Sequence, residues 1–588
     1  DACTIGHSNT AVGYLSLSGD IDGIRNTAVG FHAGQAQNDA DDNVWVGYQS
    51  GLTNTTGGSN TGVGKDSLRA NTTGGSNTAL GADALTLNTT ASNNVAIGVD
   101  ALTSNTTGAQ NTALGKGSLR LNTTASYNVA VGYLALEDTT TGANNTAVGT
   151  FALEFNTATG NTAVGYQAMG ANTSGGSNVA VGYQSLDANT TGERNTAVGY
   201  ACMGSSSTGN SNTALGNECL VDNTTGTDNV SVGDKSMFEN TTGDKNTAVG
   251  REALMHNTTA DGNTAFGYHA LRTITTAATN TALGYQTLKA NTGGTANTSV
   301  GYNALTANTT GTYNTAIGAY ALDSNTTASY NTGLGYGTLS TITSGWGNTA
   351  AGFHAGVKIT TAWGCTFIGN DAGKEVTTAQ DNTSIGHNSF VTASTGAIQN
   401  TIVGVSAGAL ISTGSNNAIL GMNAGNSITT GFNNVCLGYD SEPSAATSGN
   451  QCTLGNGSTD NLRCNDTSIS SLSDQRDKTE IIDLPIGLDF INAVRPVKFK
   501  WASRDGKQGK DGRYEAGFIA QELQTVETSK SVDYLNLVQN DNPDKLEAAP
   551  NRLFPLMVKA IQELSAENTA LKTLIKNSSS FAALKASL

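Results

Sequence analysis

Proline, aromatic residues and charge are all scarce in this 588-residue chain, which contains 6 Pro, 6% aromatic and 13% charged residues. A chain of this length would normally form several globular domains, and this composition argues against that organisation. No apolar run approaches the roughly 20 residues of a bilayer-spanning helix, so membrane insertion is not expected. Asp1 follows no signal peptide and no Met, so we expect a fragment or a processed product.

Metal-binding and disulfide patterns are missing as well. The 7 Cys are an odd number without a CxxC spacing, so neither a disulfide framework nor a zinc site is expected. Cys202 and Cys219 stand 17 residues apart, and we expect both to be small buried side chains. The 6 His have no second His or carboxylate at a ligand spacing, so we predict no metal and no cofactor.

Excess positive charge is absent from the whole chain. Residues 471–588 hold 16 Lys and Arg and 16 Asp and Glu, so the net charge of −16 falls on residues 1–470. An acidic surface repels phosphates and anionic lipid, so nucleic acid is not an expected partner. The shift in charge, together with the location of five of the 6 Pro in the C-terminal part, predicts a boundary near residues 460 to 473. We assign a shaft to 1–458, a linker to 459–472 and a second domain to 473–588.

What the shaft does contain is a repeat of the form NTAVGYxALxxNTTGxx. Its leading position recurs every 17 residues in 27 copies, with one step of 16 before Asn161 and one of 18 before Asn400. A Gly stands four residues after every leading position, which indicates a turn that needs positive φ or close approach of backbone. A 17-residue unit with Gly and Asn corners is too short for two helices. The repeat therefore predicts a mainly β fold, a parallel β-solenoid of 17-residue coils.

The alternation within NTAVG predicts which side chains fill each coil. We expect Val, with Thr on the same face, to point inward and the small Ala to point outward, in a coil of strand, corner, strand and corner. The stacked Asn residues should form amide ladders between coils. Such thin coils bury little apolar area alone, so three chains about one axis are expected. The repeat resembles the β-roll of trimeric autotransporter adhesin heads, and this resemblance implies a homotrimer.

Two features of the shaft are candidates for binding. Tyr follows the invariant Gly in eleven repeats, as a stacking platform for sugars or as packing at corners or between chains. Segments 354–364 and 386–399 depart from the consensus, and Trp363 and Phe390 are the candidate receptor contacts there. An ice-binding Thr array is a less favoured hypothesis because inward Thr would be buried. A glycan-degrading enzyme is also less favoured, because no catalytic domain interrupts the repeats.

The C-terminal region resembles a known family over residues 473 to about 576. The start SLSDQRDK, the GFIAQEL element at Gly517 to Leu523 and a terminal helix resemble, in this order, the endosialidase-type intramolecular chaperone of phage tailspikes and tail fibres. The resemblance implies a small α+β domain that trimerises, assists folding of the fibre and then cuts itself off. It implies Ser473 as nucleophile, Lys478 as its base and the Leu472–Ser473 peptide as the scissile bond. One autoproteolytic event, rather than enzymatic turnover, is expected.

The chemistry of such a cut sets requirements on the neighbouring residues. A Ser hydroxyl needs a base to attack an amide, and a lysine acts as a base only when burial or nearby positive charge favours its neutral form. Arg476 is the candidate source of that charge, and Asp474 is a further candidate for support.

The end of the chain reads as a coiled-coil helix over about 551–576. Apolar residues recur at heptad spacing, with one Asn in a core position that fixes the register. The predicted core positions are Phe554, Met557, Ile561, Leu564, Asn568, Leu571 and Ile575.

Taken with the resemblance, these features predict a structural fibre protein of a phage tail, extracellular on the virion and used for host attachment. The expected partners are two further copies, a host glycan or surface protein, and an upstream attachment domain or baseplate. The alternative is a trimeric adhesin that a bacterium secretes or displays on its surface.

Overall fold

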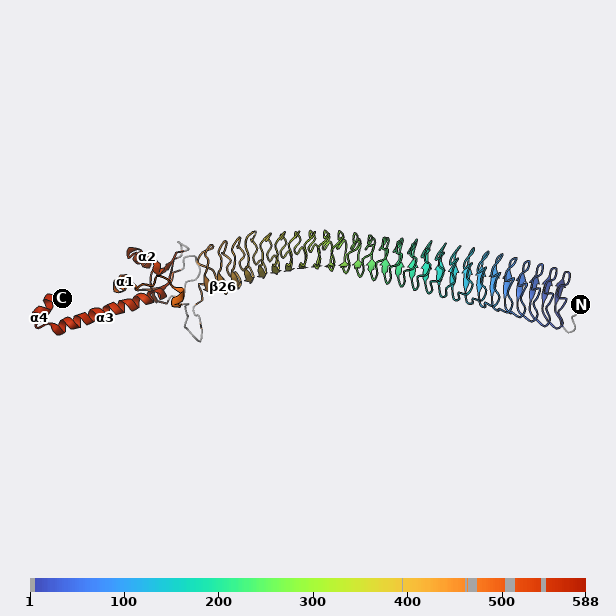
Figure 1. Cartoon of the computed structure of the whole chain (residues 1–588), viewed down its shortest axis with the longest axis horizontal. Coiled ribbons are helices and arrows are strands. Elements are labelled where there is room, and N and C mark those ends of the chain that lie inside the picture. Colours follow the sequence, from blue (N-terminus) through green and yellow to red (C-terminus); the bar gives the residue numbers. More distant parts are fainter. Residues whose placement is uncertain are drawn as a thin grey trace. The chain divides into compact units, whose positions relative to one another are not determined.

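A computed structural model describes residues 6–393, 395–459, 463, 473–502, 513–540 and 546–587. Two compact units divide the chain, Asp1–Thr378 and Ala379–Leu588, and each is described by itself. Figure 1 shows the first unit as a stack of coils. The predicted parallel β-solenoid with 17-residue coils is confirmed.

The described residues of the first unit, 6–378, contain 22 strands of three residues each, one per coil. Each pairs in parallel and in register with the next, so that Thr10 faces Thr27 and Val181 faces Val198. The strands are β1 (Thr10–Val12), β2 (Thr27–Val29), β3 (Val44–Val46), β4 (Thr61–Val63), β5 (Thr78–Leu80), β6 (Val95–Ile97), β7 (Thr112–Leu114), β8 (Val129–Val131), β9 (Thr146–Val148), β10 (Thr162–Val164), β11 (Val179–Val181), β12 (Thr196–Val198), β13 (Thr213–Leu215), β14 (Val230–Val232), β15 (Thr247–Val249), β16 (Thr264–Phe266), β17 (Thr281–Leu283), β18 (Thr298–Val300), β19 (Thr315–Ile317), β20 (Thr332–Leu334), β21 (Thr349–Ala351) and β22 (Thr366–Ile368).

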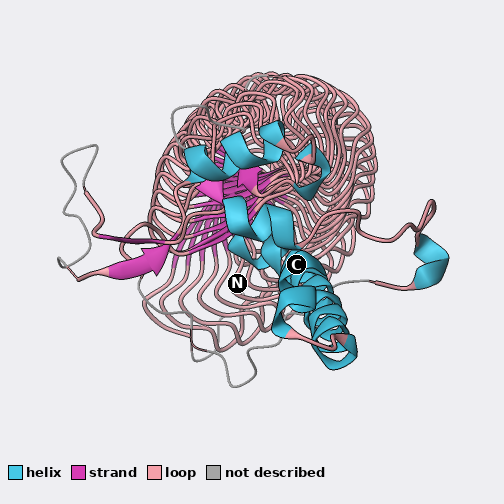
Figure 2. Cartoon of the chain, turned by 90° about the vertical axis from the view of Figure 1, so that its left-hand side faces the viewer, coloured by secondary structure: helices cyan, strands magenta, loops and turns pink. Residues whose placement is uncertain are grey.

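One strand per coil, where two were expected, is the first difference from the prediction. Figure 2 shows the strands as a single band, while the remainder of each coil is loop. In that remainder Leu68 and its equivalents adopt left-handed φ, 51° at Leu68, which interrupts any second extended run.

The inward and outward faces of the strand are the reverse of the prediction. The middle residue, usually Ala, is buried in every strand from β2 through the end of the first unit, whereas the third residue, usually Val or Leu, is exposed or half-buried. The coil is thin, and Leu68 and its equivalents already fill its centre, completely buried. Only a small side chain fits opposite them, so Val and Thr point outward.

Exceptions to the Ala rule show how tightly the interior is filled. Trp45 replaces Ala in β3 and is fully buried, and Gly34 and Gly51 then stand where the inward Leu is usual. A Cβ on Gly34 would lie 2.6 Å from Trp45 Cδ1. Phe367 in β22 is matched in the same way by Gly356 and Gly373. Interiors this dense require that added volume at one position be removed at another.

The predicted Asn ladders are present in two rows. In the leading row, the backbone N–H of Asn77 donates to Asn60 Oδ1 at 2.9 Å, and Asn77 Nδ2 donates to the Ala91 carbonyl at 2.9 Å. In the corner row, Asn71 Nδ2 donates to Asn54 Oδ1 at 2.7 Å. These amides are completely buried, so the ladders satisfy polar groups that would otherwise oppose burial.

Asn71→Ala is expected to destabilise its coil by about 1–3 kcal/mol, because Asn54 Oδ1 and the Gly74 carbonyl each lose a donor inside the coil. Hydrogen exchange measured by mass spectrometry should show faster exchange in the coils around residue 71. Asn370→Ala is the control because Asn370 is exposed and belongs to neither row. Equal exchange in the two variants would contradict a stabilising role for the corner row.

The two irregular steps leave the strands in register and change only a corner. Before Asn161, Asn156 Nδ2 donates to a carbonyl two residues on, at Ala158, whereas Asn71 reaches three residues on, to Gly74. In the second unit, Asn382 Nδ2 donates to the Ala397 carbonyl, 15 residues farther along the chain, whereas the corresponding bond from Asn77 to Ala91 spans 14 residues. The shorter and the longer repeat are therefore both accommodated at a corner of the coil.

The second unit contains further coils and a small α/β region. Its coil strands are β23 (Thr383–Ile385), β24 (Thr401–Val403), β25 (Ala418–Leu420), β26 (Val435–Leu437) and β27 (Cys452–Leu454). The other elements are η1 (Gln475–Asp477), α1 (Leu488–Ala493), β28 (Val497–Phe499), β29 (Glu515–Gly517), α2 (Ala520–Ser529), η2 (Asp533–Leu535), β30 (Val538–Gln539), β31 (Glu547–Ala548), η3 (Pro550–Leu553), α3 (Phe554–Asn577) and α4 (Phe581–Ser587). β28 pairs with β29 and β30 with β31, both antiparallel.

One hydrophobic core joins the helices of this α/β region. The core contains three completely buried side chains: Phe490 of α1, Leu556 of α3, and Leu537, which lies between η2 and β30. Phe518 packs against this cluster. Phe518 belongs to the GFIAQEL segment, which runs from the end of β29 into α2. The segment's Leu523 is also buried. The terminal helix therefore begins as part of the domain core and not as a separate stalk.

Candidate functional site

The predicted cleavage residues lie around the short helix η1, where the C-terminal domain begins. Asp474 caps this helix, because its carboxylate accepts a hydrogen bond from the Arg476 N–H at 2.9 Å. The turn brings Lys478 back toward the start of the segment. Lys478 Nζ donates to Ser473 Oγ at 2.5 Å and contacts the Ser473 carbonyl at 3.4 Å.

Arg476 is placed differently from the expectation. Its guanidinium donates to both carboxylate oxygens of Asp474, from Nε at 3.1 Å. This pair lowers the pKa of Asp474, because hydrogen bonds from Arg476 favour the charged carboxylate. Asp474 thus balances the positive charge that Arg476 was expected to supply to Lys478.

The arrangement supplies a hydroxyl nucleophile and an amine within hydrogen-bonding distance of it. That contact is what a Ser/Lys pair needs to remove the hydroxyl proton during attack on an acyl carbon. Both side chains are exposed to solvent in the single chain. Leu472, whose carbonyl would be attacked, lies outside the described residues, so the assignment of the scissile bond stays a prediction.

The predicted heptad positions share one exposed face of α3. Phe554 and Ile561 are 67% and 64% exposed, and Met557, Leu564, Leu571 and Ile575 are exposed as well. Leu556 and Ala560, on another face, are buried in the domain core. We call the first set, with Asn568, the α3 seam. A single chain leaves this apolar seam in water, as expected of a helix that pairs with another helix.

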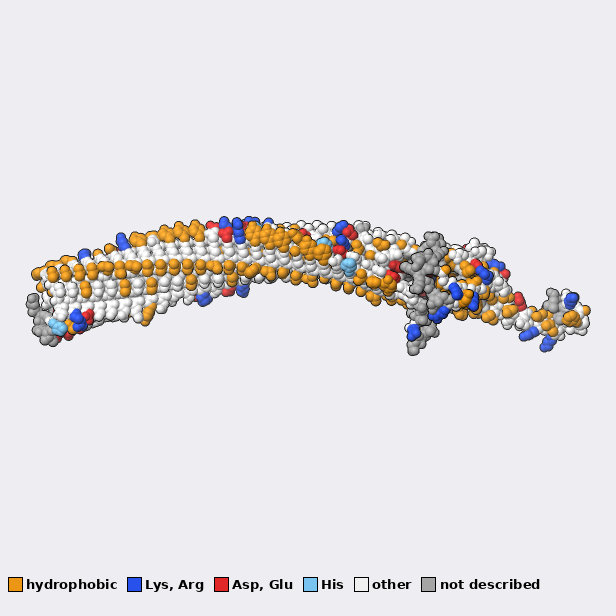
Figure 3. All heavy atoms as spheres, turned by 180° about the vertical axis from the view of Figure 1, so that it is seen from behind, with side chains coloured by type: hydrophobic (Ala, Val, Ile, Leu, Met, Phe, Trp, Pro, Cys, Tyr) orange, Lys and Arg blue, Asp and Glu red, His pale blue; other side chains and the backbone are white. Residues whose placement is uncertain are grey.

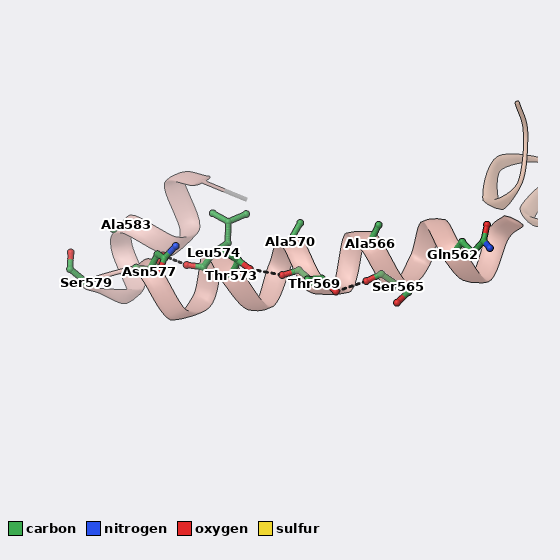
Figure 4. Close-up of a pocket in the computed structure, with 11 residues that line it drawn as sticks. Gln562, Ser565, Ala566, Thr569, Ala570, Thr573, Leu574, Asn577, Ser579 and Ala583 are labelled. Atoms are coloured by element: carbon green, nitrogen blue, oxygen red, sulfur yellow. Dashed lines mark hydrogen bonds between the residues drawn. The ribbon is translucent and has the colours of Figure 1, made fainter. Parts of the chain in front are cut away.

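A hollow of about 1,000 Å³ lies beside the C-terminal half of α3, against α4. Figure 4 shows Ala566, Ala570 and Leu574 along the helix, with Ser565, Thr569 and Thr573 beside them. The hydroxyls of Thr569 and Thr573 donate to carbonyls one turn earlier, at 2.8 Å. None of the described residues that line it is charged or titratable.

In parts of the Tyr row of the shaft, the rings of successive coils stack on one another. Tyr166, Tyr183 and Tyr200 stack at centroid distances of 5.3 and 5.4 Å, nearly parallel. Tyr268, Tyr285 and Tyr302 repeat the pattern farther along. A sugar needs an open ring face, and inside a ladder each face is occupied by the next ring. The geometry therefore favours packing between coils over a sugar platform.

The two candidate receptor contacts have different surroundings. Phe390 is completely buried at the position of the inward Leu, so its prediction as a receptor contact is wrong. Trp363 is half-buried and stacks on Trp346 with centroids 5.6 Å apart. Trp346 is itself 55% exposed, and its contribution was not foreseen. Receptor contact by Trp363 stays a prediction.

Cys202 and Cys219 are free thiols buried in consecutive coils, as predicted. Within the part of the chain that is described, no group of three or more His, Cys, Asp or Glu is placed to hold a metal ion. Among the described helices, none has both the length and the apolar character to cross a membrane.

Residues 473–532 match the family model of the chaperone of endosialidase, Peptidase_S74. The match begins at Ser473, the predicted nucleophile, and includes the GFIAQEL segment. A comparison with curated proteins gave no match. A chaperone-of-endosialidase region that follows a β-solenoid of 17-residue coils fits a tail fibre or tailspike protein with a C-terminal chaperone domain.

Proposed function

We propose that this chain is a subunit of a phage tail fibre or tailspike. Its solenoid is the shaft that reaches the host surface, where it binds a glycan or a surface protein. Its C-terminal domain brings three copies together, promotes folding of the shaft and then cuts the peptide bond before Ser473. The observation that carries the proposal is the match to a chaperone family from residue 473, after a long series of coils whose last strand ends at Leu454.

The α3 seam supports the assembly step. Its residues repeat with alternating spacings of three and four, so they form one stripe along the helix. The stripe is apolar except for Asn568, and the chain itself leaves it uncovered. Burial of each such side chain against other copies contributes about 1.5–3 kcal/mol. We propose a trimer because the chaperone domains that this region resembles are trimeric.

Ile561→Asp combined with Leu564→Asp is expected to convert the assembled protein into monomers, since two charges per chain would then face each other in the seam. Light scattering coupled to gel filtration gives the mass directly. Ala566→Asp is the matched control because it adds a charge to α3 away from the seam. A trimeric double variant, or a parent that is monomeric before any change, would refute assembly through this helix.

The proposed location of the protein in the phage tail is tested by labelling purified virions with antibodies against the shaft. Label on the tails is the expected result for a fibre subunit. Label on the surface of bacteria that carry no phage would instead support the adhesin alternative.

A further inference from the structure

The outward face of the strands forms a continuous surface, which we call the shaft face. It consists of the first and third residues of β1 to β22, usually Thr and Val. Phe266 and Leu283 are 51% and 45% exposed there. The third residue is Val, Leu, Ile, Phe or Ala in each of these strands. Figure 3 shows rows of hydrophobic side chains that run from coil to coil along the stack.

Charge is excluded from this face. None of the first or third residues of β1 to β22 is Asp, Glu, Lys or Arg, although residues 1–470 carry the whole net charge of −16. Acidic and basic side chains lie elsewhere on the coils, as in the ion pairs Arg120–Glu137 and Arg272–Glu252. Soluble monomers rarely leave contiguous apolar patches larger than a few hundred Å² uncovered.

The size of the shaft face exceeds what a stable interface needs. Its 22 strands, about 4.8 Å apart and about 10 Å long, present about 1,000 Å². A standard protein–protein interface buries about 800 Å² on each partner.

We propose that the shaft faces of separate copies of this chain pack against one another, so that the rows of Val and Leu line the interior of the assembled shaft. A partner must offer an uncharged surface over about 100 Å, matched in spacing to coils that repeat every 4.8 Å. A second copy of the chain presents the same rows of side chains at the same spacing. A host receptor of unrelated fold would not be expected to match this spacing over the same length. This inference rests on the proposed self-association and adds the surface that the shaft uses for it.

Thiol labelling of the full chain distinguishes a covered face from an open one. Leu283→Cys places a thiol on the shaft face, and Phe155→Cys places one at an exposed position outside the strands. In the assembled protein we expect a maleimide to label Cys at 283 at least about tenfold more slowly than Cys at 155, because packed interfaces exclude reagents. Mass spectrometry of peptides assigns each label, and denatured protein should label equally at both positions.

Charge substitution gives a second, independent readout. Phe266→Asp with Leu283→Asp should leave each coil folded, since both side chains point outward, but should separate the shafts and increase their cross-section in X-ray scattering. Leu87→Asp with Phe155→Asp is the matched control, because these residues are similarly exposed but lie outside the strands. Equal labelling at 283 and 155 in an assembled parent overturns this inference alone, whereas a monomeric parent overturns the proposed function.

Discussion

Ser473→Ala should remain a single uncut chain of 588 residues, whereas the parent should release a fragment that begins at Ser473. In the expected reaction, Ser473 Oγ attacks the carbonyl carbon of Leu472, the peptide C–N bond breaks and the freed amine takes up a proton. Water then hydrolyses the ester, which leaves a carboxylate on Leu472 and restores the hydroxyl. Removal of Oγ stops the first step completely.

Denaturing gels and N-terminal sequencing of the fragment measure this result. Lys478→Ala should slow the cut, because Lys478 is the amine in contact with Ser473 Oγ. Ser473→Cys is the positive control, since a thiol can make the same attack. Light scattering under native conditions should show that both alanine variants still assemble, because neither residue belongs to the α3 seam. A cut Ser473→Ala chain, or a parent that stays intact after assembly, would remove Ser473 from this role.

Gly199→Ala should open the shaft locally, at a cost of about 3 kcal/mol or more. Gly199 has a φ of +141°, which L-residues rarely adopt, and an added Cβ would overlap the carbonyl oxygen of Gly216 in the next coil. Neither coil can move away without breaking the in-register pairing of β12 with β13. We therefore expect strain and a steric clash to act together.

Limited proteolysis is the suitable measurement, because a repeat protein can open in one region while the remainder stays folded. New cleavage sites should appear within a few coils of residue 199. Gly293→Ala is the control, since its added Cβ would meet only Thr310 Cγ2 at 3.7 Å. Unchanged proteolysis of Gly199→Ala would mean that the coils tolerate a wider spacing than the structure indicates.

Much of the shaft could be predicted from the sequence because the same structural unit is encoded in 27 copies of one repeat. The invariant Gly, the Asn ladders and the corner irregularities all follow from local chemistry and spacing. Which face of the strand points into the coil could not be predicted in this way. A period of two places Ala and Val on opposite faces, but it does not indicate which of them is inside. The signal that could have decided this is Trp45, whose coil and its neighbour carry Gly in place of the inward Leu.

The site shows a similar division. The proximity of Ser473 and Lys478 followed from the family resemblance, and the short helix between them accounts for it physically. The pairing of Arg476 with Asp474 was missed, although a carboxylate two residues before an arginine is a natural partner. The burial of Phe390 was missed because its segment was interpreted as an exposed loop, although Phe390 stands eight residues after Asn382, which is the position of the inward Leu.

The in-register repetition of near-identical coils leaves the axial alignment of paired shafts almost undetermined. Two copies displaced by 17 residues would still place Thr beside Thr and Val beside Val, and would lose only the contacts of the coils left over at each end. Sideways attraction alone would therefore produce staggered, frayed bundles. In the proposed assembly, the non-repeating C-terminal domain, with the polar Asn568 in its helical seam, would give all chains a common reference point, so that their shafts start at the same coil.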